Sequence, residues 1–340
     1  MDHKVAINFS DGKTLFCNVP HNGLLLDAAL AHGIKIPLDC REGVCGTCQG
    51  RCEFGNYSQD YVDDETLSAS DLAQRKVLSC QTRVLSEAAF YFDFDSSLCS
   101  AARAVMFEGC VTQLRQVSLS TVLVELELPD DGTTLAFLPG QYARLKVPGT
   151  DEFRSYSFAT RPGGRKTRFL VRMLAHGVMT HYLRERCKLG ELIEFEAPLG
   201  SFYLRQIERP LVLVAGGTGL SAFLGMLDEI AERGGCGKPV HLYHGVRGAA
   251  DFCELERIEQ FSHSIPGFRF FPVVSEPDDQ WQGRKGFITE HLARDEHIDV
   301  PCDIYLCGPP AMVDSIKTWV QARPLSSARL FAEKFVQSNT

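Results

Sequence analysis

Residues 40–48 of this 340-residue chain read Cys40-Arg41-Glu42-Gly43-Val44-Cys45-Gly46-Thr47-Cys48. Three cysteines therefore lie close together, and a fourth, Cys80, comes well after them in the chain. Gly43 and Gly46 separate the three cysteines, and glycine is the residue that best tolerates the positive φ angles of a tightly wrapped loop. The stretch predicts a loop that surrounds a small group with three thiolates, while Cys80 supplies a fourth from another part of the fold.

The pattern C-x4-C-x2-C with a distant fourth cysteine is the spacing of a plant-type [2Fe–2S] cluster, which carries one electron at a time. A structural zinc site fits less well, because it usually uses two close pairs of cysteines and only Cys45 and Cys48 form such a pair. The predicted cluster ligands are Cys40, Cys45, Cys48 and Cys80. We interpret the nearby Cys52 as a packing residue.

Length and composition indicate a globular protein of two or three domains. Hydrophobic residues make up 44% of the chain and charged residues 23%, as in ordinary folded proteins. The first residues lack the apolar run of an export signal, and no stretch approaches the ~18 uninterrupted apolar residues of a membrane span. Since thirteen cysteines without an export signal indicate a reducing compartment, we expect a cytoplasmic protein that does not enter a membrane.

The net charge of −8 is concentrated near the cysteines. Residues 1–100 hold 14 acidic and 8 basic side chains, a net of −6, which leaves −2 for the rest of the chain. Part of this charge is a local run made of Asp60, Asp63, Asp64 and Glu65. The run is either a solvated loop or a docking face for a positively charged partner protein. Nucleic acid is disfavoured as a partner, because no basic stripe is present.

The first hundred residues predict a compact β-grasp module. Residues 3–9 and 14–19 read as two strands around an Asp11-Gly12 hairpin turn. A helical pattern over 24–32 ends at a glycine. Closing strands are expected at 77–84 and 89–94, and the weakly patterned residues 96–103 read as a linker.

The remaining chain shows two different sequence patterns. From about 105 to 206, short strands alternate with Gly and Pro turns, which indicates an antiparallel barrel. From 208 onward, the apolar run 211–215 reads as a buried parallel strand. Further strands are expected at 240–246, 269–274 and 303–307, alternating with helices, as in an α/β sheet.

Two segments of the barrel region carry residue types suited to a flavin. In Arg154-Ser155-Tyr156-Ser157, an Arg can clamp a phosphate, a Tyr ring can stack on the isoalloxazine, and a Ser hydroxyl can reach a flavin nitrogen. Gly177-Val178-Met179-Thr180 opens a predicted helix, whose N-terminus can bind pyrophosphate.

Two turns of the α/β region point to a nucleotide. Gly216-Gly217-Thr218-Gly219 follows a buried strand and precedes a helix, the context in which a backbone approaches a pyrophosphate. An ordinary strand-to-helix turn remains the alternative. Cys307-Gly308-Pro309 ends another strand, and ligands of such sheets bind at the carboxyl ends of strands. Cys307 is therefore expected to face the same crevice as Thr218.

In this order, the motifs make the chain resemble the ferredoxin–NADP reductase superfamily with a plant-type [2Fe–2S] ferredoxin domain fused at the N-terminus. More closely, it is similar to the reductase components of two-component aromatic-ring-hydroxylating dioxygenases, in the benzoate, toluate and anthranilate group, with the anthranilate reductases preferred. The resemblance covers essentially the whole chain. It implies a ferredoxin domain at 1–98, a six-stranded antiparallel β-barrel that binds FAD at 104–207, and a Rossmann-like parallel-sheet domain that binds NAD at 208–340.

The resemblance also implies residue roles. Ser157, Cys307 and Glu333 would lie at the site of hydride transfer. The FAD-binding residues would be Arg154, Ser155, Tyr156, Ser157, Gly177, Val178, Met179, Thr180 and Phe335. The NAD-binding residues would be Gly217, Thr218, Gly219, Cys307, Gly308 and Pro309. Related chains usually carry a proline soon after the Gly-Thr-Gly, where this chain has Leu220-Ser221-Ala222; proline is favourable but dispensable in a first helical turn.

The implied function is transfer of electrons from NADH through FAD and the [2Fe–2S] cluster to a terminal oxygenase of the Rieske non-haem iron type, by a monomeric reductase. Arg247, at the end of the second α/β strand, could instead bind the 2′-phosphate of NADPH. Three alternatives stay open. The chain could be the reductase of a diiron monooxygenase of the phenol or methane hydroxylase type, a ferredoxin-like carrier without enzymatic activity, or a reductase with a small-molecule substrate of its own.

Overall fold

The computed structural model describes residues 2–100, 104–292, 300–323 and 328–336. Its backbone separates into two compact units. Unit 1 comprises Met1–Arg103 with Leu199–Ser201, and unit 2 comprises Ala104–Pro198 with Phe202–Thr340. No helix in the described segments is long and apolar enough to cross a membrane. All thirteen cysteines lie in described segments, and none forms a disulfide bond.

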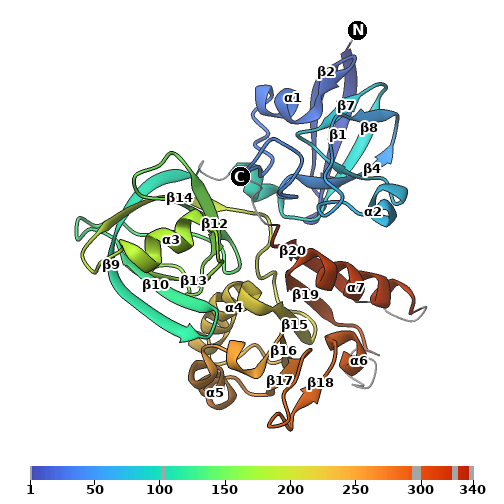
Figure 1. Cartoon of the computed structure of the whole chain (residues 1–340). Coiled ribbons are helices and arrows are strands. Elements are labelled where there is room, and N and C mark those ends of the chain that lie inside the picture. Colours follow the sequence, from blue (N-terminus) through green and yellow to red (C-terminus); the bar gives the residue numbers. More distant parts are fainter. Residues whose placement is uncertain (1, 101–103, 293–299, 324–327, 337–340) are drawn as a thin grey trace. The chain divides into compact units, whose positions relative to one another are not determined.

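Unit 1 is built on a mixed five-stranded sheet in which an early and a late strand are neighbours (Figure 1). Its order is β2-β1-β8-β4-β6, and β1 pairs with β2 in antiparallel and with β8 in parallel. A smaller sheet has the order β3-β7-β5. The strands are β1 (Asp2–Phe9), β2 (Thr14–Pro20), β3 (Gly23–Leu24), β4 (Gln49–Phe54), β5 (Tyr57–Gln59), β6 (Lys76–Leu78), β7 (Thr82–Val84) and β8 (Ala88–Phe92). The helices are α1 (Leu25–Ala31) and α2 (Ala69–Ala73).

This arrangement confirms the β-grasp prediction, with two differences. Residues 77–84 are not one strand, because a turn at Ser79–Gln81 separates β6 from β7 and places the two strands in different sheets. Cys80 lies in this turn, outside both strands. The expected linker begins with a short 3-10 helix, Ser96–Cys99, whose Cys99 is buried, and residues 101–103 lie outside the described segments.

The first half of unit 2 is a closed antiparallel sheet with the order β12-β11-β14-β9-β10-β13. A bridge between Phe158 and Phe169 joins its two edges and closes the barrel that the strand spacing predicted. Its elements are β9 (Val105–Ser118), β10 (Thr121–Glu127), β11 (Tyr142–Lys146), β12 (Phe153–Ser157), β13 (Lys166–Arg172), α3 (Val178–Glu185) and β14 (Leu192–Leu199). Stacked Phe137 and Phe158 lie in its core, with ring centroids 4.0 Å apart.

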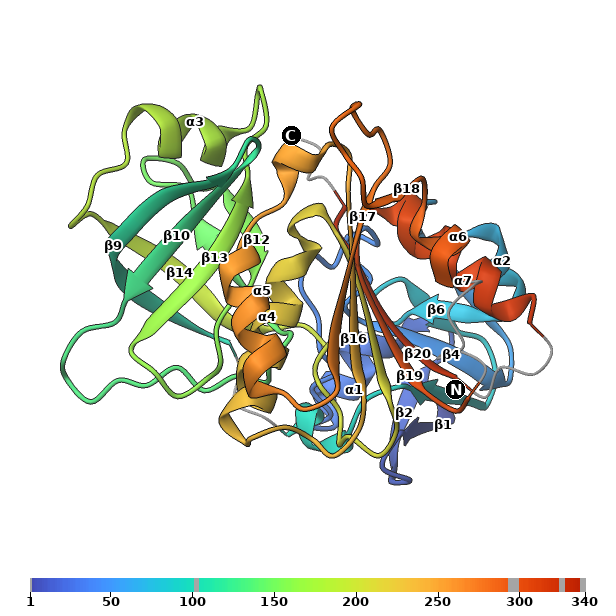
Figure 2. The same cartoon turned by 90° about the horizontal axis from the view of Figure 1, so that it is seen from below.

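The second half of unit 2 is a parallel sheet with the order β18-β17-β16-β15-β19-β20. Helices α4 and α5 cover one face of this sheet, and α6 and α7 cover the other (Figure 2). The strands are β15 (Leu211–Gly216), β16 (Val240–Val246), β17 (Phe268–Val274), β18 (Arg284–Lys285), β19 (Asp303–Gly308) and β20 (Arg329–Lys334). The helices are α4 (Leu220–Glu232), α5 (Leu255–Ser264), α6 (Ile288–Leu292) and α7 (Pro310–Gln321).

The chain builds this sheet outward from β15. Strands β16, β17 and β18 are added on one side of β15, and β19 and β20 are then added on the other side. Ligands of such sheets bind outside the carboxyl ends of the strands at this reversal. The barrel and the α/β half share one hydrophobic cluster, in which Leu123 and Ala159 of the barrel pack with Phe223 and Leu227 of α4. The boundary expected at 207/208 falls between β14 and β15 and stays a prediction.

One buried tyrosine ties the segment after the barrel to the parallel sheet. The ring of Tyr305 stacks on Phe331 with centroids 4.7 Å apart, and its hydroxyl accepts a hydrogen bond from the Arg205 backbone N–H at 3.0 Å. Tyr305 is fully buried, so water cannot replace this hydroxyl. The bond therefore contributes to the stability of unit 2.

We predict that Tyr305→Phe lowers the free energy of unfolding by about 1–2 kcal/mol, because the Arg205 N–H loses its acceptor while the ring packing is kept. Both tryptophans of the chain, Trp281 and Trp319, lie in the α/β half, so urea unfolding followed by tryptophan fluorescence reports on this region. An unchanged unfolding midpoint and slope would show that the bond adds nothing.

Candidate functional site

The cysteine loop lies between α1 and β4 and brings its thiols together in two pairs. A hydrogen bond with the Cys45 thiol is the largest cause of a pKa of about 5 at Cys40. A hydrogen bond with Cys48 is, in the same way, the largest cause of the lowered pKa of Cys80. The four cysteines predicted as ligands therefore meet as Cys40 with Cys45 and as Cys48 with Cys80.

This arrangement in pairs fits a two-iron cluster. A [2Fe–2S] core has two irons held by four thiolates, so each iron takes two. Within the described residues, no three or more His, Cys, Asp or Glu side chains converge on one metal position.

The loop backbone is shaped around the sulfur atoms. Gly43 has a φ of 82°, and a Cβ on it would lie only 2.4 Å from the Tyr61 carbonyl oxygen. The N–H of Gly43 donates to Cys80 and that of Glu42 donates to the Cys40 sulfur, the latter at 3.3 Å. Backbone donors to cluster sulfurs are one means by which proteins tune the reduction potential.

Two polar side chains that brace the loop were not found from sequence. The Gln81 amide donates to the Arg41 carbonyl at 2.8 Å and accepts from the Tyr61 N–H at 3.2 Å. Thr66 donates its hydroxyl hydrogen to the Val44 carbonyl at 2.7 Å. Neither residue belongs to a motif, and the position of Gln81 directly after the fourth cysteine was the one available signal.

The predicted flavin motif lies on β12, an outer strand of the barrel sheet that pairs with β11. The Arg154 guanidinium donates to the Glu152 carboxylate and to the Phe153 carbonyl. Ser155 is exposed, whereas Tyr156 is half-buried against the barrel core, and burial raises the pKa of its phenol.

Ser157, at the end of β12, is the strongest indication that a group binds here. Its side chain is buried, and its hydroxyl has no hydrogen-bond partner among the described residues. Buried polar atoms normally find a partner. An unpartnered hydroxyl at this position therefore fits a bound molecule that would supply one, as a flavin nitrogen would.

The second flavin segment begins α3, with Gly177 as its N-cap. The side chains of Met179 and Thr180 are buried, and the Thr180 hydroxyl accepts the Leu174 N–H at 3.1 Å. These two side chains are therefore occupied within the barrel. What Gly177 to Thr180 can offer a phosphate is the set of free backbone N–H groups at a helix N-terminus.

The predicted nucleotide turn forms a short 3-10 helix, Gly217–Gly219, that runs directly into α4. A Cβ on Gly219 would lie 2.1 Å from the carbonyl oxygen of Cys307, so only glycine fits. Gly217 has a φ of 53° and open space where a Cβ would be. Gly219 therefore packs the turn against β19, whereas Gly217 and Thr218 are only partly buried.

Cys307 and Glu333 are neighbours, as expected, because they are paired in register on β19 and β20. Cys307 is fully buried, and burial together with the charge of Glu333 raises the pKa of its thiol well above the usual value. The N–H of Phe335 donates to the Gly308 carbonyl at 2.8 Å, which holds the end of β20 beside this turn. Pro309 caps α7.

His244, near the end of β16, is a further residue of this edge that belongs to no sequence motif. It is fully buried, and its Nε2 lies 3.0 Å from the Gly217 carbonyl oxygen. Burial lowers the pKa of its imidazole to about 4, so the ring is neutral and Nε2 carries the hydrogen that it donates. This hydrogen bond from His244 helps to hold the nucleotide turn in place.

Models of three protein families match successive parts of the chain. A 2Fe-2S iron-sulfur cluster binding domain matches residues 8–85, an oxidoreductase FAD-binding domain matches 108–203, and an oxidoreductase NAD-binding domain matches 213–318. The first match contains the cysteine loop of unit 1. The second covers the barrel of unit 2, and the third covers most of its parallel sheet.

Similar proteins extend this match over the full length. The electron transfer component of anthranilate 1,2-dioxygenase from Acinetobacter baylyi is 54% identical, over 100% of this chain and 99% of that protein. The electron transfer component of toluate 1,2-dioxygenase from Pseudomonas putida is 39% identical, over 99% and 100%. Among solved structures, a cytochrome P450 reductase from Amycolatopsis is 32% identical and superposes with a TM-score of 0.73, over 98% of this chain and 100% of that chain.

Identity of this degree along the whole chain, with all three cofactor-binding domains in the same order, confirms the resemblance seen in the motifs. The chain belongs to the family of dioxygenase electron transfer components, the iron–sulfur flavoprotein reductases that combine a [2Fe–2S] ferredoxin domain with FAD-binding and NAD-binding domains.

Proposed function

We propose that this protein is the NADH-dependent reductase of an aromatic-ring dioxygenase of the anthranilate type and that it acts as a monomer in the cytoplasm. The pairing of Cys40 with Cys45 and of Cys48 with Cys80 carries the proposal, because it suits a cluster that releases electrons singly. The 54% identity to the anthranilate dioxygenase component supports this partner, a terminal oxygenase of the Rieske non-haem iron type.

On the barrel, we assign the FAD to the residues predicted from the motif. Arg154 would exchange its contact with Glu152 for the flavin phosphate, Tyr156 would lie against the ring, and the unpartnered hydroxyl of Ser157 would meet a flavin nitrogen. When bound, FAD would accept an electron pair from NADH and pass single electrons onward. The α3 N-terminus at Gly177 would hold the pyrophosphate.

On the parallel sheet, Gly217 and Thr218 would hold the NADH pyrophosphate, supported by His244. Cys307 and Glu333 would lie at the nicotinamide, with Gly308 and Pro309 forming the adjacent turn. Phe335, half-buried beside Gly308, would cover the flavin, as the resemblance implies. With these assignments, the proposed NADH site lies at the carboxyl ends of β15 and β19, where the sheet reverses.

The Amycolatopsis relative shows why the partner needs a direct test, since that reductase has the same full-length fold and its name pairs it with a cytochrome P450. Reconstitution with purified terminal oxygenases, following NADH consumption that depends on an aromatic substrate, distinguishes the candidates. Coupled turnover with an anthranilate oxygenase is expected. Coupling to a diiron hydroxylase alone would reverse the assignment of the partner.

We predict that Cys45→Ala removes the cluster absorbance and abolishes electron delivery to the oxygenase, while NADH still reduces the flavin and ferricyanide is still reduced from it. Cys52→Ala is the matched control, because Cys52 is a buried free thiol near the loop that should not bind iron. Anaerobic NADH titrations follow both centres by absorbance. Loss of the cluster in Cys52→Ala would overturn the ligand assignment, and a cluster that stays oxidised in the wild type would overturn the electron path.

The preference for NADH rests on an ion pair at the same edge of the sheet. Arg247, which follows β16, could attract the 2′-phosphate of NADPH. Its Nε instead lies 3.1 Å from Glu276, which follows β17, and its carbonyl accepts the Glu276 N–H at 2.8 Å. The carboxylate neutralises Arg247 and would repel a phosphate dianion. We infer that Glu276 favours NADH.

Glu276→Gln should raise kcat/KM for NADPH relative to NADH about fivefold, since an exposed ion pair is worth up to about 1 kcal/mol. Steady-state ferricyanide reduction with each donor measures this ratio. Glu229→Gln is the control, because it breaks the Arg233–Glu229 pair on α4, away from the strand ends. An equal ratio in wild type and Glu276→Gln would contradict the assignment.

The acidic run of the ferredoxin domain is only partly available to a partner. The Asp60 carboxylate accepts two bonds from Arg83, at 2.7 and 2.9 Å, and Asp63 accepts the Glu65 N–H at 2.9 Å. The Asp63 backbone N–H also donates to the Gly43 carbonyl at 3.2 Å, which braces the cysteine loop. Asp64 is exposed, and we propose that its charge takes part in docking the oxygenase.

Asp64→Lys should slow reduction of the oxygenase about two- to fivefold at low ionic strength, and the difference should shrink as salt screens the charge. Ferricyanide reduction should not change. Glu87→Lys, an equal charge reversal at an exposed position outside the run, is the control. Equal losses with ferricyanide and oxygenase would remove the docking role.

A further inference from the structure

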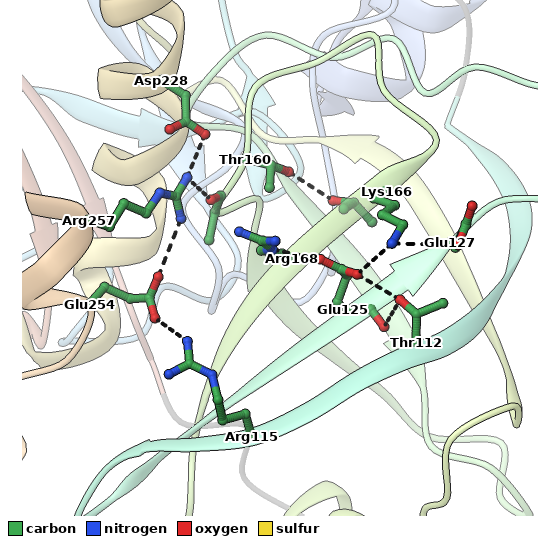
Figure 3. A network of polar contacts seen from close by, with 12 residues as sticks. Thr112, Arg115, Glu125, Glu127, Thr160, Lys166, Arg168, Asp228, Glu254 and Arg257 are labelled. Carbon is green, nitrogen blue, oxygen red and sulfur yellow. Dashed lines mark hydrogen bonds and ion pairs between the residues drawn. The ribbon is translucent and has the colours of Figure 1, made fainter. Parts of the chain in front are cut away.

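An ion-pair network joins the barrel to the α/β half of unit 2 (Figure 3). At its centre is Arg257 of α5, whose side chain is 13% exposed. Its Nη2 donates to the Ala159 carbonyl of the barrel at 2.7 Å and to the Asp228 carboxylate of α4. Its Nη1 lies 3.7 Å from Glu254. One guanidinium therefore contacts the barrel, helix α4 and the N-cap residue of its own helix.

Glu254 extends this network back to the barrel. Its other carboxylate oxygen accepts a hydrogen bond from Arg115 of β9 at 3.1 Å, and its side chain is 7% exposed. Glu254 has a φ of 55°, in the left-handed region that a glutamate rarely adopts. Strained backbone of this kind persists where surrounding contacts over-determine it, often at functional positions.

Two further hydrogen bonds join the barrel to the α/β half. Ser120 donates to the Asp251 carboxylate at 2.6 Å, and the Leu119 N–H donates to the Ala250 carbonyl at 3.0 Å. The β9–β10 hairpin is thus hydrogen-bonded to the segment just before α5. Together with the Arg257 network, these contacts form a polar seam between the barrel and the α/β half, which also share a hydrophobic cluster.

The seam lies between the flavin motif of β12 and the nucleotide turn Gly217–Gly219. Ala159 comes two residues after Ser157, at the end of the flavin motif. Asp228 lies on α4, and the N-terminus of α4 is the nucleotide turn Gly217–Gly219. Arg257 thus connects the strand segment that follows the flavin motif to the helix that begins at the nucleotide turn.

A second contact reinforces this connection. Gly225 of α4 lies against the same barrel segment, since a Cβ on it would be 2.8 Å from the Thr160 carbonyl oxygen and 3.0 Å from that of Phe158. The barrel backbone at 158–160 is therefore held between α4 and Arg257. A shift of this segment would move the flavin strand relative to the nucleotide helix.

We propose that Arg257 is a positioning residue for hydride transfer, which sets the separation between the flavin strand and the nucleotide turn through Ala159 and Asp228. The inference rests on the proposed function. Hydride transfer needs the reacting atoms about 3–3.5 Å apart, and a displacement of about 1 Å can slow such a step about 100-fold. Arg257 itself touches neither cofactor in this assignment.

The test compares Arg257→Gln with the double variant Arg257→Gln/Asp228→Asn. The single variant leaves the largely buried Asp228 charge without its partner and should lower stability. The double variant removes both charges and should recover stability without restoring the link. Arg165→Gln is the matched control, because Arg165 also binds a backbone carbonyl, that of Leu128, and two carboxylates, all within the barrel.

Three readouts are taken on the FAD-loaded proteins. Stopped-flow absorbance gives the rate of flavin reduction at saturating NADH, and titration gives FAD content and NAD⁺ affinity. The third is the long-wavelength charge-transfer band that forms when NAD⁺ is added to the reduced protein, a direct sign that the two rings are stacked. A merely structural role would leave this band and the rate unchanged in the stable double variant.

Both Arg257 variants are expected to reduce flavin about 100-fold more slowly and to lose the charge-transfer band, while FAD content and NAD⁺ affinity stay close to wild type. Arg165→Gln should match wild type. A double variant with the wild-type rate and band would overturn the inference and leave the proposed function intact. A wild-type flavin that NADH does not reduce would overturn the proposed function and this inference with it.

Discussion

The contact between two backbones at the carboxyl ends of β15 and β19 is the constraint on which the candidate nicotinamide site depends. A Cβ on Gly219 would lie 2.1 Å from the Cys307 carbonyl oxygen, and one on Gly308 would lie 2.9 Å from Gly216. No side chain fits at either point. Because the strand ends touch directly, the nucleotide turn and Cys307 share one edge, and His244 can reach the Gly217 carbonyl from the next strand. A wider gap would separate all these groups at once.

From this edge, α4 carries the same constraint to the barrel. The helix starts at the nucleotide turn, packs its apolar face into the cluster shared with Leu123 and Ala159, and approaches the barrel backbone at Gly225 without an intervening side chain. Apolar packing of this kind resists separation of the two halves but specifies little about their rotation, because it is non-directional. The directional contacts that fix rotation are the hydrogen bonds and ion pairs of the seam around Arg257.

Sequence reasoning predicted the parts of the site whose signal is local. The strand–turn–helix at Gly216–Gly219 is formed as expected. The roles predicted for the cysteine loop and for the residues of β12 also rest on patterns within a few positions, and they stay predictions. What sequence could not give are pairs that are distant along the chain, such as Arg257 with Ala159, or Gln81 with the cysteine loop. Such pairs have no period and no motif. The prediction of one strand over 77–84 was wrong for a related reason. The chain turns at Cys80, whose thiol pairs with the distant Cys48 of the cysteine loop.

The division of the chain into two compact units fits the two kinds of transfer in the proposed electron path. A hydride moves only between atoms in contact, so the barrel and the α/β half need one fixed geometry, and they form a single compact unit with a shared core and a polar seam. An electron can cross a longer gap, so the cluster need not be locked to the flavin in the same way. The ferredoxin domain accordingly is a separate compact unit whose polar braces, Gln81 and Thr66, hold its own cysteine loop. Each unit therefore has contacts of its own that hold the groups its step would use.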